Sequence, residues 1–407
     1  MQRRSTAALF ALSLAAACGV PAAAADAAHP GDLIADRGGA IVIAWGASDG
    51  SIPAIVRIVP GGPARVVHRF APYDTPGTLA LVGGRVAGLD GYPASGGRAW
   101  ILGGQRLRTV YRVPDEGYGT IAFTGGAPAE PGLLFAVDGG RGTACRGQRV
   151  HCGAIEALTA GGARRIATFA RPTSAYPLAG DGRTAWFTAH DPERVIVVRD
   201  GRLRDVSTGG RQAVDAAPFG AGAVLTLRDR RDVLLAALDG VRPLRIVARI
   251  HADDASARAD VRARAGVAYL LVATARFGSA EESRLYTVSG PRSVRLVRSW
   301  SDEFVRLHFV DARGRAVVST EHRTVGGASS TTRGTLLRVA PSGAASTVPL
   351  GALAGRAAVS DAIETPDGAV WSLLGFYGRP VAVVRSGPST AQAFHVDAGS
   401  GQKLRKK

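Results

Sequence analysis

Two cysteines and a histidine lie within eight residues of the sequence, at Cys145, His151 and Cys152. Thiolates and imidazoles bind zinc, and paired thiols form disulfides or carry redox chemistry. A structural zinc site needs four such ligands, and this segment supplies three. The spacing also differs from the CxxC of thioredoxin-like redox motifs. In an oxidising compartment we therefore expect Cys145 and Cys152 to form a disulfide that closes one short loop.

A second set of residues falls in segments predicted as loops and could bind a ligand. Arginine makes bidentate hydrogen bonds to carboxylates and phosphates, so a set rich in arginine suits an anionic ligand. Each member also has a structural alternative, as the charged end of a hairpin or a loop residue bonded to nearby backbone. The candidate ligand-binding residues are His190, Asp191, Arg194, Arg230, Arg231, Arg276, His322, Tyr377 and Arg379.

Three further histidines, His68, His308 and His395, lie within apolar strand patterns and are expected to be structural. The sequence contains no HExxH motif and no Walker A loop. No metal site, cofactor or catalytic residue is predicted. A glycosidase needs two facing carboxylates, and one sequence cannot show which loop acids meet.

The amino terminus predicts export. Arg3 and Arg4 precede an apolar run at 7–17, and alanines at 23, 24 and 25 come directly before Asp26. These features are typical of a signal peptide over residues 1–25, so we expect a periplasmic or extracellular protein. Cys18 follows three alanines, as in a lipoprotein cleavage box, and lipid anchoring there is the alternative. No later apolar stretch is long enough for a transmembrane span.

The chain is strongly basic. Its formal net charge is +17, from 50 Lys and Arg against 33 Asp and Glu, and all its lysines lie in residues 401–407. A basic exported protein attracts anionic partners, such as envelope polysaccharide, lipid headgroups or an acidic protein surface. The compartment argues against nucleic acid, and arginines are not interleaved with aromatics as in stacking platforms. We expect a monomer.

Internal repetition is the strongest signal in the sequence. An apolar run follows a glycine eight times, at successive spacings of 40 to 54 residues. A second pattern follows each such run: an apolar strand, a glycine turn and a strand with arginines. The glycines that precede the eight apolar runs are Gly39, Gly84, Gly132, Gly182, Gly222, Gly266, Gly314 and Gly368.

Each repeat is interpreted as four short antiparallel strands, and this is the size of a propeller blade. The sequence therefore predicts an all-β fold, a β-propeller of eight four-stranded blades, with seven blades as the alternative. A β-sandwich or a parallel β-helix would not repeat paired hairpins in this way. We expect one propeller domain over 26–397 and a basic tail over 398–407. The predicted units lie near 31–70, 78–114, 119–170, 177–208, 213–250, 259–300, 305–350 and 358–397.

Residues 134–169 resemble the Gloeo/Verruco repeat of bacterial extracellular proteins. Leu134-Phe135 stands for its opening, Gly139-Gly140 for its glycine stretch, and 153–158 for its middle strand. The resemblance covers about a tenth of the chain and implies an exported, propeller-like repeat protein. It implies no reaction, because the motif of the family is structural.

The predicted topology separates two rims. In a four-stranded blade the first and third connections share one rim, and in this chain these are the tight glycine turns. The longer connections gather at the opposite rim, where binding residues usually lie. The main hypothesis is a ligand-binding or protein-interaction scaffold with a basic long-loop face. The alternative is a propeller hydrolase or lyase that acts on sugars or lactones.

Overall fold

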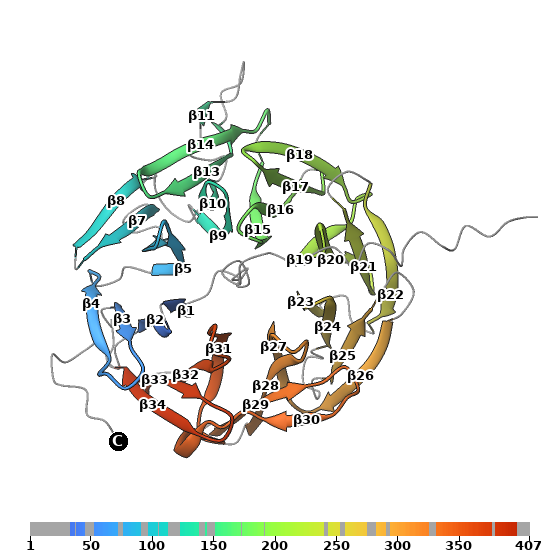
Figure 1. The fold of residues 1–407 in the computed structure, drawn as a ribbon. Helices are drawn as coiled ribbons and strands as arrows, with labels where there is room; N and C mark the ends of the chain where they lie inside the picture. The colour runs from blue at the N-terminus through green and yellow to red at the C-terminus, as the bar shows by residue number, and fades with distance from the viewer. Residues whose placement is uncertain are drawn as a thin grey trace, which may run out of the picture.

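The computed structural model is a ring of small β-sheets (Figure 1). It describes residues 33–36, 38–44, 53–71, 76–90, 97–104, 106–112, 123–137, 143–144, 151–171, 173–190, 192–239, 243–252, 257–274, 282–289, 294–324, 331–376 and 379–396. Eight sheets of four antiparallel strands follow one another around the ring. The predicted β-propeller with eight blades is confirmed, and the seven-bladed alternative is wrong.

The first four blades take up the amino-terminal half of the ring. Blade 1 holds β1 (Leu33–Asp36), β2 (Gly39–Ala44), β3 (Ala54–Ile58) and β4 (Arg65–Arg69); blade 2 holds β5 (Pro76–Val82), β6 (Arg85–Asp90), β7 (Arg98–Gly103) and β8 (Arg106–Arg112). Blade 3 holds β9 (Phe123–Ala129), β10 (Gly132–Val137), β13 (Ala154–Thr159) and β14 (Gly162–Thr168); blade 4 holds β15 (Ala175–Gly180), β16 (Thr184–Ala189), β17 (Arg194–Arg199) and β18 (Arg202–Ser207). A short hairpin of β11 (Thr143–Ala144) and β12 (His151–Cys152) is inserted in blade 3.

The other four blades complete the ring. Blade 5 holds β19 (Gln212–Phe219), β20 (Gly222–Asp229), β21 (Asp232–Leu238) and β22 (Arg245–His251); blade 6 holds β23 (Arg258–Arg264), β24 (Val267–Thr274), β25 (Glu282–Val288) and β26 (Val294–Ser301). Blade 7 holds β27 (Phe304–Val310), β28 (Ala316–Thr324), β29 (Thr331–Val339) and β30 (Ala345–Thr347); blade 8 holds β31 (Ala358–Glu364), β32 (Val370–Phe376), β33 (Arg379–Ser386) and β34 (Ala391–Val396). The first strand of every blade faces the centre of the ring, and the fourth lies at its circumference (Figure 1).

The middle strands are apolar on both faces because each blade packs between two others. In β2, with the sequence GAIVIA, every residue is buried. Ala40 and Val42 pack toward blade 8, whereas Ile41 and Ile43 pack toward blade 2. Alternate residues of a strand point to opposite faces, so one continuous apolar run supplies two interfaces.

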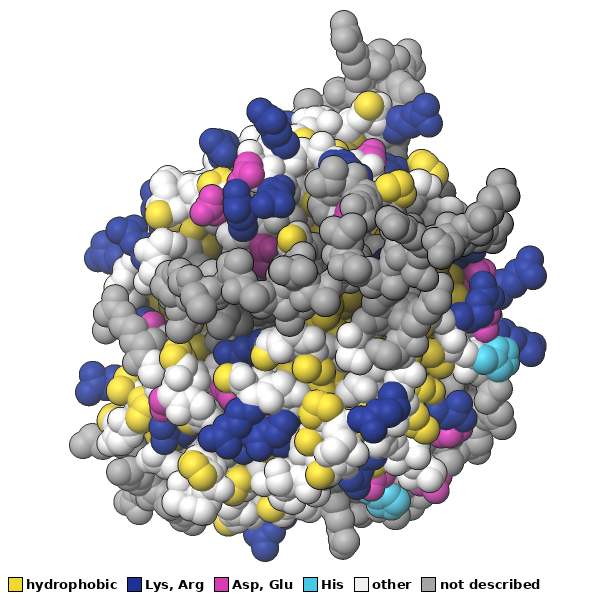
Figure 2. Space-filling model, turned by 45° about the vertical axis from the view of Figure 1, so that its right-hand side comes forward, with side chains coloured by type: hydrophobic (Ala, Val, Ile, Leu, Met, Phe, Trp, Pro, Cys, Tyr) yellow, Lys and Arg dark blue, Asp and Glu magenta, His cyan; other side chains and the backbone are white. Residues whose placement is uncertain are grey.

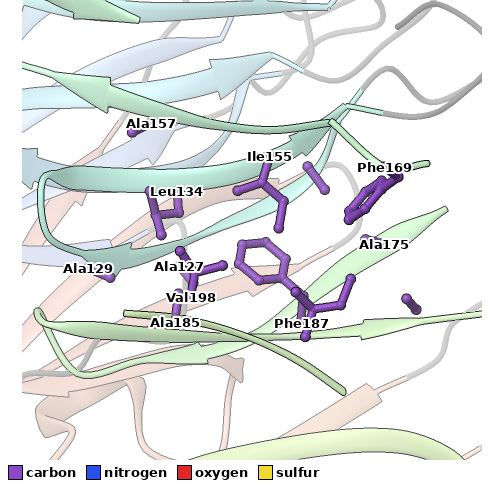
Figure 3. Close-up of a cluster of buried hydrophobic side chains, with 13 residues drawn as sticks. Ala127, Ala129, Leu134, Ile155, Ala157, Phe169, Ala175, Ala185, Phe187 and Val198 are labelled. Carbon is purple, nitrogen blue, oxygen red and sulfur yellow. The ribbon is translucent and has the colours of Figure 1, made fainter. Parts of the chain in front are cut away.

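The core of the described chain is divided into eight clusters, and each lies between two neighbouring blades. Figure 3 shows the cluster between blades 3 and 4, where Phe187 of β16 lies among Ile155, Phe169 and Leu134. Among the described residues, no single core fills the centre of the ring. The stability of each sheet therefore depends on the sheets on either side of it.

Packing between the first and last blades closes the ring. In the described part of the chain, blade 1 contains amino-terminal strands and blade 8 carboxy-terminal strands, and no sheet combines the two. Instead, Leu33 and Val56 of blade 1 share a cluster with Trp371, Val383 and Phe394 of blade 8. The joint is apolar and has the same form as the other seven interfaces.

The repeated glycines have two different physical reasons. Gly368 has φ of +77°, and L-residues with a side chain rarely adopt this backbone conformation. Gly222 has no positive φ, but a Cβ there would lie 2.0 Å from the carbonyl oxygen of Leu238 on a neighbouring strand. The same glycine position of the repeat thus serves a turn in blade 8 and a close approach of two backbones in blade 5.

Helix is nearly absent from the described residues, where a 3-10 turn at Gly351–Leu353 follows β30. None of the helices in this part of the chain is long and apolar enough to cross a membrane.

Truncation of Trp371 tests the closing joint. Trp371 is fully buried, so Trp371→Ala should lower the free energy of unfolding by about 3–5 kcal/mol, through lost burial and a cavity. Urea denaturation measures the change. Leu296→Ala is the control, since Leu296 is 51% exposed on β26 and its loss should cost about 0.5 kcal/mol or less. Equal stabilities of the two variants would show that blades 1 and 8 are not packed together.

Candidate functional site

Several predicted site residues lie outside the described residues. They are Cys18, Cys145, Asp191, Arg276 and Tyr377. Arg379 begins β33, but its side chain is also outside the described part. The long-loop face can therefore be followed only through the remaining candidates.

His190 and Arg194 lie at the junction of β16 and β17 in blade 4. Nδ1 of His190 is 2.9 Å from a carboxylate oxygen of Glu193, and its ring is 5.5 Å from that of Tyr176. Arg194 donates to the carbonyl of Pro192 at 3.2 Å and to the hydroxyl of Thr173 at 3.3 Å. Both side chains are half-buried and engaged within their own blade. Their structural role is therefore better supported than ligand binding.

Arg230 and Arg231 form the two-residue turn between β20 and β21 of blade 5. Both are exposed, and Arg230 has φ of +56°. Neither makes an ion pair with the described residues. Their neighbour Asp232 is 3.0 Å from His251 and bonds Arg249, and these contacts lower the pKa of its carboxyl.

The described candidates are spread around the ring. His322 is exposed on β28 of blade 7, far along the chain from the candidates on blades 4 and 5. Among the described residues no hydrogen bond or ion pair joins any two of the predicted ligand-binding side chains. A common site for these residues therefore stays a prediction.

Cys152 lies on β12 and is fully buried. Its register partner across the short hairpin is Thr143. Cys145, two residues further along the chain from Thr143, lies outside the described part. The Cys145–Cys152 pairing thus stays a prediction.

The outer strands carry a concentration of arginine that is a candidate interaction surface. The fourth strands of blades 1 to 6 contain 13 arginines and one acidic residue, Asp205, whereas β30 and β34 contain neither. The arginines are Arg65, Arg69, Arg106, Arg108, Arg112, Arg164, Arg165, Arg202, Arg204, Arg245, Arg249, Arg295 and Arg298. In Figure 2, basic side chains project at many places on the molecule.

The clearest part of this surface lies on blades 1 and 2. The neighbouring outer strands β4 and β8 contain five exposed arginines and no acid. None of the five forms an ion pair with the described residues. We call Arg65, Arg69, Arg106, Arg108 and Arg112 the outer basic face.

A second group of charges lies at the inner strands of blades 5 to 7 and was not predicted. We call Asp215 of β19, Arg258, Asp260 and Arg262 of β23, and Arg306 and His308 of β27 the inner-strand cluster. Alternating charged residues in β23, RADVRAR, were its only sequence signal. An ordinary half-exposed strand gives the same alternating pattern. The sequence therefore did not distinguish such a strand from one that contributes to a cluster of charges.

Asp215 and Arg262 join blades 5 and 6. Nη1 of Arg262 donates to Oδ2 of Asp215 at 2.6 Å, and the backbone N–H of Val261 donates to the same oxygen at 2.8 Å. The two side chains are 14% and 17% exposed. Burial raises the pKa of Asp215, while Arg262 and two backbone N–H groups oppose that rise.

Arginines also reach the exposed backbone of the next blade. Nε of Arg262 donates to the carbonyl of His308 at 3.0 Å, and Arg306 donates to that of Ser360 at 3.4 Å. Both carbonyls belong to β-bulges, which lie between Leu307 and Phe309 and between Val359 and Asp361. A bulge leaves one residue out of the ladder, so its carbonyl is free to accept a side-chain donor.

Three guanidinium groups surround His308. Burial and the charges of Arg306, Arg262 and Arg258 lower the pKa of His308 to about 3, so its imidazole is neutral at physiological pH. Nε2 of His308 is 2.9 Å from the hydroxyl of Ser319. The prediction that His308 is a structural strand histidine agrees with these contacts.

Asp260 is the second carboxylate of the cluster. It accepts a hydrogen bond from Nε of Arg258 at 3.0 Å. Burial raises its pKa; Arg258 and Arg262 oppose the rise, and the charge of Asp215 adds to it. Two acids thus lie within electrostatic reach of each other, each neutralised by an arginine.

Other features of the described chain add no catalytic centre. No group of three or more His, Cys, Asp and Glu side chains in this part could hold a metal ion. The segment Gly46-Ala47-Ser48-Asp49-Gly50 matches the GxSxG pattern of serine hydrolases, and the sequence predictions omitted it. That pattern works at a strand-to-helix turn, whereas this one lies between antiparallel β2 and β3, outside the described residues.

The comparisons with known proteins agree with the fold. No protein-family model and no curated protein matches the sequence. The chain is similar to a prolyl endopeptidase, from a study of two such enzymes and their inter-domain dynamics, with a TM-score of 0.52 and 13% identity over 87% of this chain and 54% of that one. A puromycin-hydrolysing peptidase of Mycobacterium tuberculosis has a TM-score of 0.49 and 15% identity over 82% of this chain and 53% of that chain. This chain spans about half the length of either peptidase, and the likeness to the prolyl endopeptidase shows the fold alone.

Replacement of Asp215 tests the inner-strand cluster. Asp215→Ala leaves Arg262 without its carboxylate in a largely buried place, and should cost about 3 kcal/mol of unfolding free energy. Asp205→Ala is the matched control, because Asp205 is 54% exposed and lies 3.4 Å from Arg194. Its loss should cost about 1 kcal/mol or less. If urea denaturation gave the same loss of unfolding free energy for both variants, the Asp215–Arg262 pair would be as screened by solvent as the Asp205–Arg194 pair.

Proposed function

We propose that this protein is an exported β-propeller that binds anionic polysaccharide through the arginines of its outer strands. The excess of 13 arginines over one acid on those strands is the observation that carries the proposal. The predicted long-loop face supports it less well, because its described members are spread over several blades.

Edge protection alone does not explain this charge. Outer strands are edge strands, and charged side chains and bulges prevent their pairing with another chain. The ladder shifts between β3 and β4 and between β7 and β8 provide such bulges. Acidic residues also carry a charge that can protect an edge, however, and the whole chain has 33 of them against 50 basic residues. The charged residues of the outer strands are almost all positive, and this indicates that these strands attract an anion.

The arrangement suits a long ligand better than a small one. The arginines lie on six consecutive blades, and the five of the outer basic face point from two neighbouring strands. Exposed guanidiniums are screened by salt and are individually weak. Many weak contacts with one polyanion add up to useful affinity. An anionic polysaccharide of the cell envelope has this repeating charge, and the predicted export would bring the protein to it.

A hydrolase or lyase is the second candidate function. It is favoured by Asp215 and Asp260, two carboxylates of raised pKa at the inner strands. A pair of such acids could serve glycoside cleavage. Both are held by arginines, however, and this favours a structural or binding role. Release of new reducing ends when the protein is incubated with polysaccharide would support the enzyme instead.

Three substitutions on β8 test the binding proposal. Arg106→Gln, Arg108→Gln and Arg112→Gln together should weaken binding to heparin, used as the probe, by roughly ten-fold. Each exposed charge is worth at most about 1 kcal/mol, and 1.4 kcal/mol is a factor of ten. Wild-type binding should also weaken between about 0.05 M and about 0.5 M NaCl, because salt screens exposed charges.

The control removes three exposed arginines that lie away from the outer strands, by Arg85→Gln, Arg313→Gln and Arg356→Gln. It lowers the net charge equally and should bind nearly as wild type does. Equal losses in both triple variants would mean that overall charge, and not the outer basic face, determines binding. Affinity confined to anionic lipid vesicles would contradict the choice of polysaccharide.

The predicted export also has a chemical test. If the chain is exported and oxidised, intact mass should show removal of residues 1–25 and a loss of two hydrogens at Cys145 and Cys152. Reduction and alkylation should then modify two thiols that are blocked before. Two free thiols in protein purified from its native compartment would contradict the disulfide. A lipid on Cys18 would show that the protein is anchored as a lipoprotein and would contradict cleavage after residue 25.

A further inference from the structure

We infer that the inner-strand cluster binds a small oxyanion, a carboxylate or a phosphate, at the guanidinium group of Arg306. This site is separate from the outer basic face and does not depend on it. Three features support it: the charge balance of the cluster, the unused donors of Arg306 and the position of the inner strands.

The charges of the cluster do not balance. Arg262 pairs with Asp215, and Arg258 pairs with Asp260. Arg306 has no carboxylate partner among the described residues. His308, which the three arginines surround, is neutral. One positive charge is therefore left over in a place where acids are otherwise matched to bases.

Arg306 also makes little use of its hydrogen-bonding groups. A guanidinium has five N–H donors. The described contacts of Arg306 are one long bond, 3.4 Å from Nη1 to the carbonyl of Ser360, and a position 5.0 Å above the ring of Phe304. Its Nε is buried without a partner. An oxyanion that enters from solvent would meet the Nη donors, whose described partner is the Ser360 carbonyl alone, and would gain bonds that the protein itself does not supply.

The ring of Phe304 contacts a second arginine of the cluster. The guanidinium of Arg258 lies 4.7 Å from the centre of the Phe304 ring, and that of Arg306 lies 5.0 Å from it. Arg258 is already held by Asp260 and by the carbonyl of Val305, so it is rigid. A guanidinium held against an aromatic ring keeps the planar donors that carboxylate and phosphate prefer.

Solvent reaches the inner-strand cluster. The side chains of Arg258, Asp260 and Arg262 are 32%, 22% and 17% exposed. They lie on β23, which with β19 and β27 faces the centre of the ring (Figure 1). Partial burial strengthens a charge-assisted hydrogen bond, and partial exposure still allows a small ion to enter.

Calorimetric titration with inorganic phosphate and with citrate tests the site. Wild type should bind at least one of them saturably. Arg306→Gln should weaken that binding at least ten-fold, and Arg306→Lys should weaken it less, because lysine keeps the charge and loses the planar donors. The control Arg85→Gln removes one exposed charge from β6, away from both proposed binding surfaces, and should leave binding unchanged.

The outcomes separate this inference from the proposed function. Binding should persist in the triple variant of β8, which lacks part of the outer basic face. Thermal denaturation of Arg306→Gln checks that the variant is folded, and Arg306→Lys takes its place if it is not. Absence of saturable binding to both anions up to about 10 mM, or equal binding by wild type and both Arg306 variants, would overturn the site; binding of one anion alone would identify the ligand class.

Discussion

The structure depends on one constraint: a four-stranded sheet has two apolar faces, and each must be covered by another sheet. A ring meets this constraint for every blade at once, whereas a row would leave two faces bare. The eight interblade clusters of the described chain satisfy it with short aliphatic strands such as β2. The joint between blades 8 and 1 has no shared strand, so the apolar contact of Leu33 and Val56 with Trp371 is what prevents the ring from opening.

Charged residues occur at both the inner and the outer edges of the blades, on strands such as β23 and β8. The two edges use arginine differently. At the inner edge, Arg262 bonds Asp215 and a bulge carbonyl of the next blade, so its charge is used within the ring. At the outer edge, arginines such as Arg106 and Arg108 have no acidic partner in the described chain, and their charge is available to a ligand.

The sequence predicted the repeating parts of this structure and missed what depends on contacts between repeats. Glycines such as Gly222 and Gly368, and the strand runs after them, were sufficient for eight blades, because turn and strand chemistry is local. The role of Asp215 was not accessible, since its partner Arg262 lies 47 residues away in the next blade. Bulge carbonyls such as that of His308 leave no mark in the sequence at all. The rim candidates were chosen by residue type, and the structure distributes them over blades that one sequence cannot place around a ring.

Hydrogen exchange followed by mass spectrometry tests the closed ring most directly. If packing closes it, backbone amides of β2 and β3 in blade 1, and of β32 and β33 in blade 8, should exchange as slowly as those of β20 and β21 in blade 5, because no blade is terminal. If the amides of blades 1 and 8 instead exchanged orders of magnitude faster than those of blade 5, the chain would be an open array with frayed ends, and apolar packing would not hold blades 1 and 8 together.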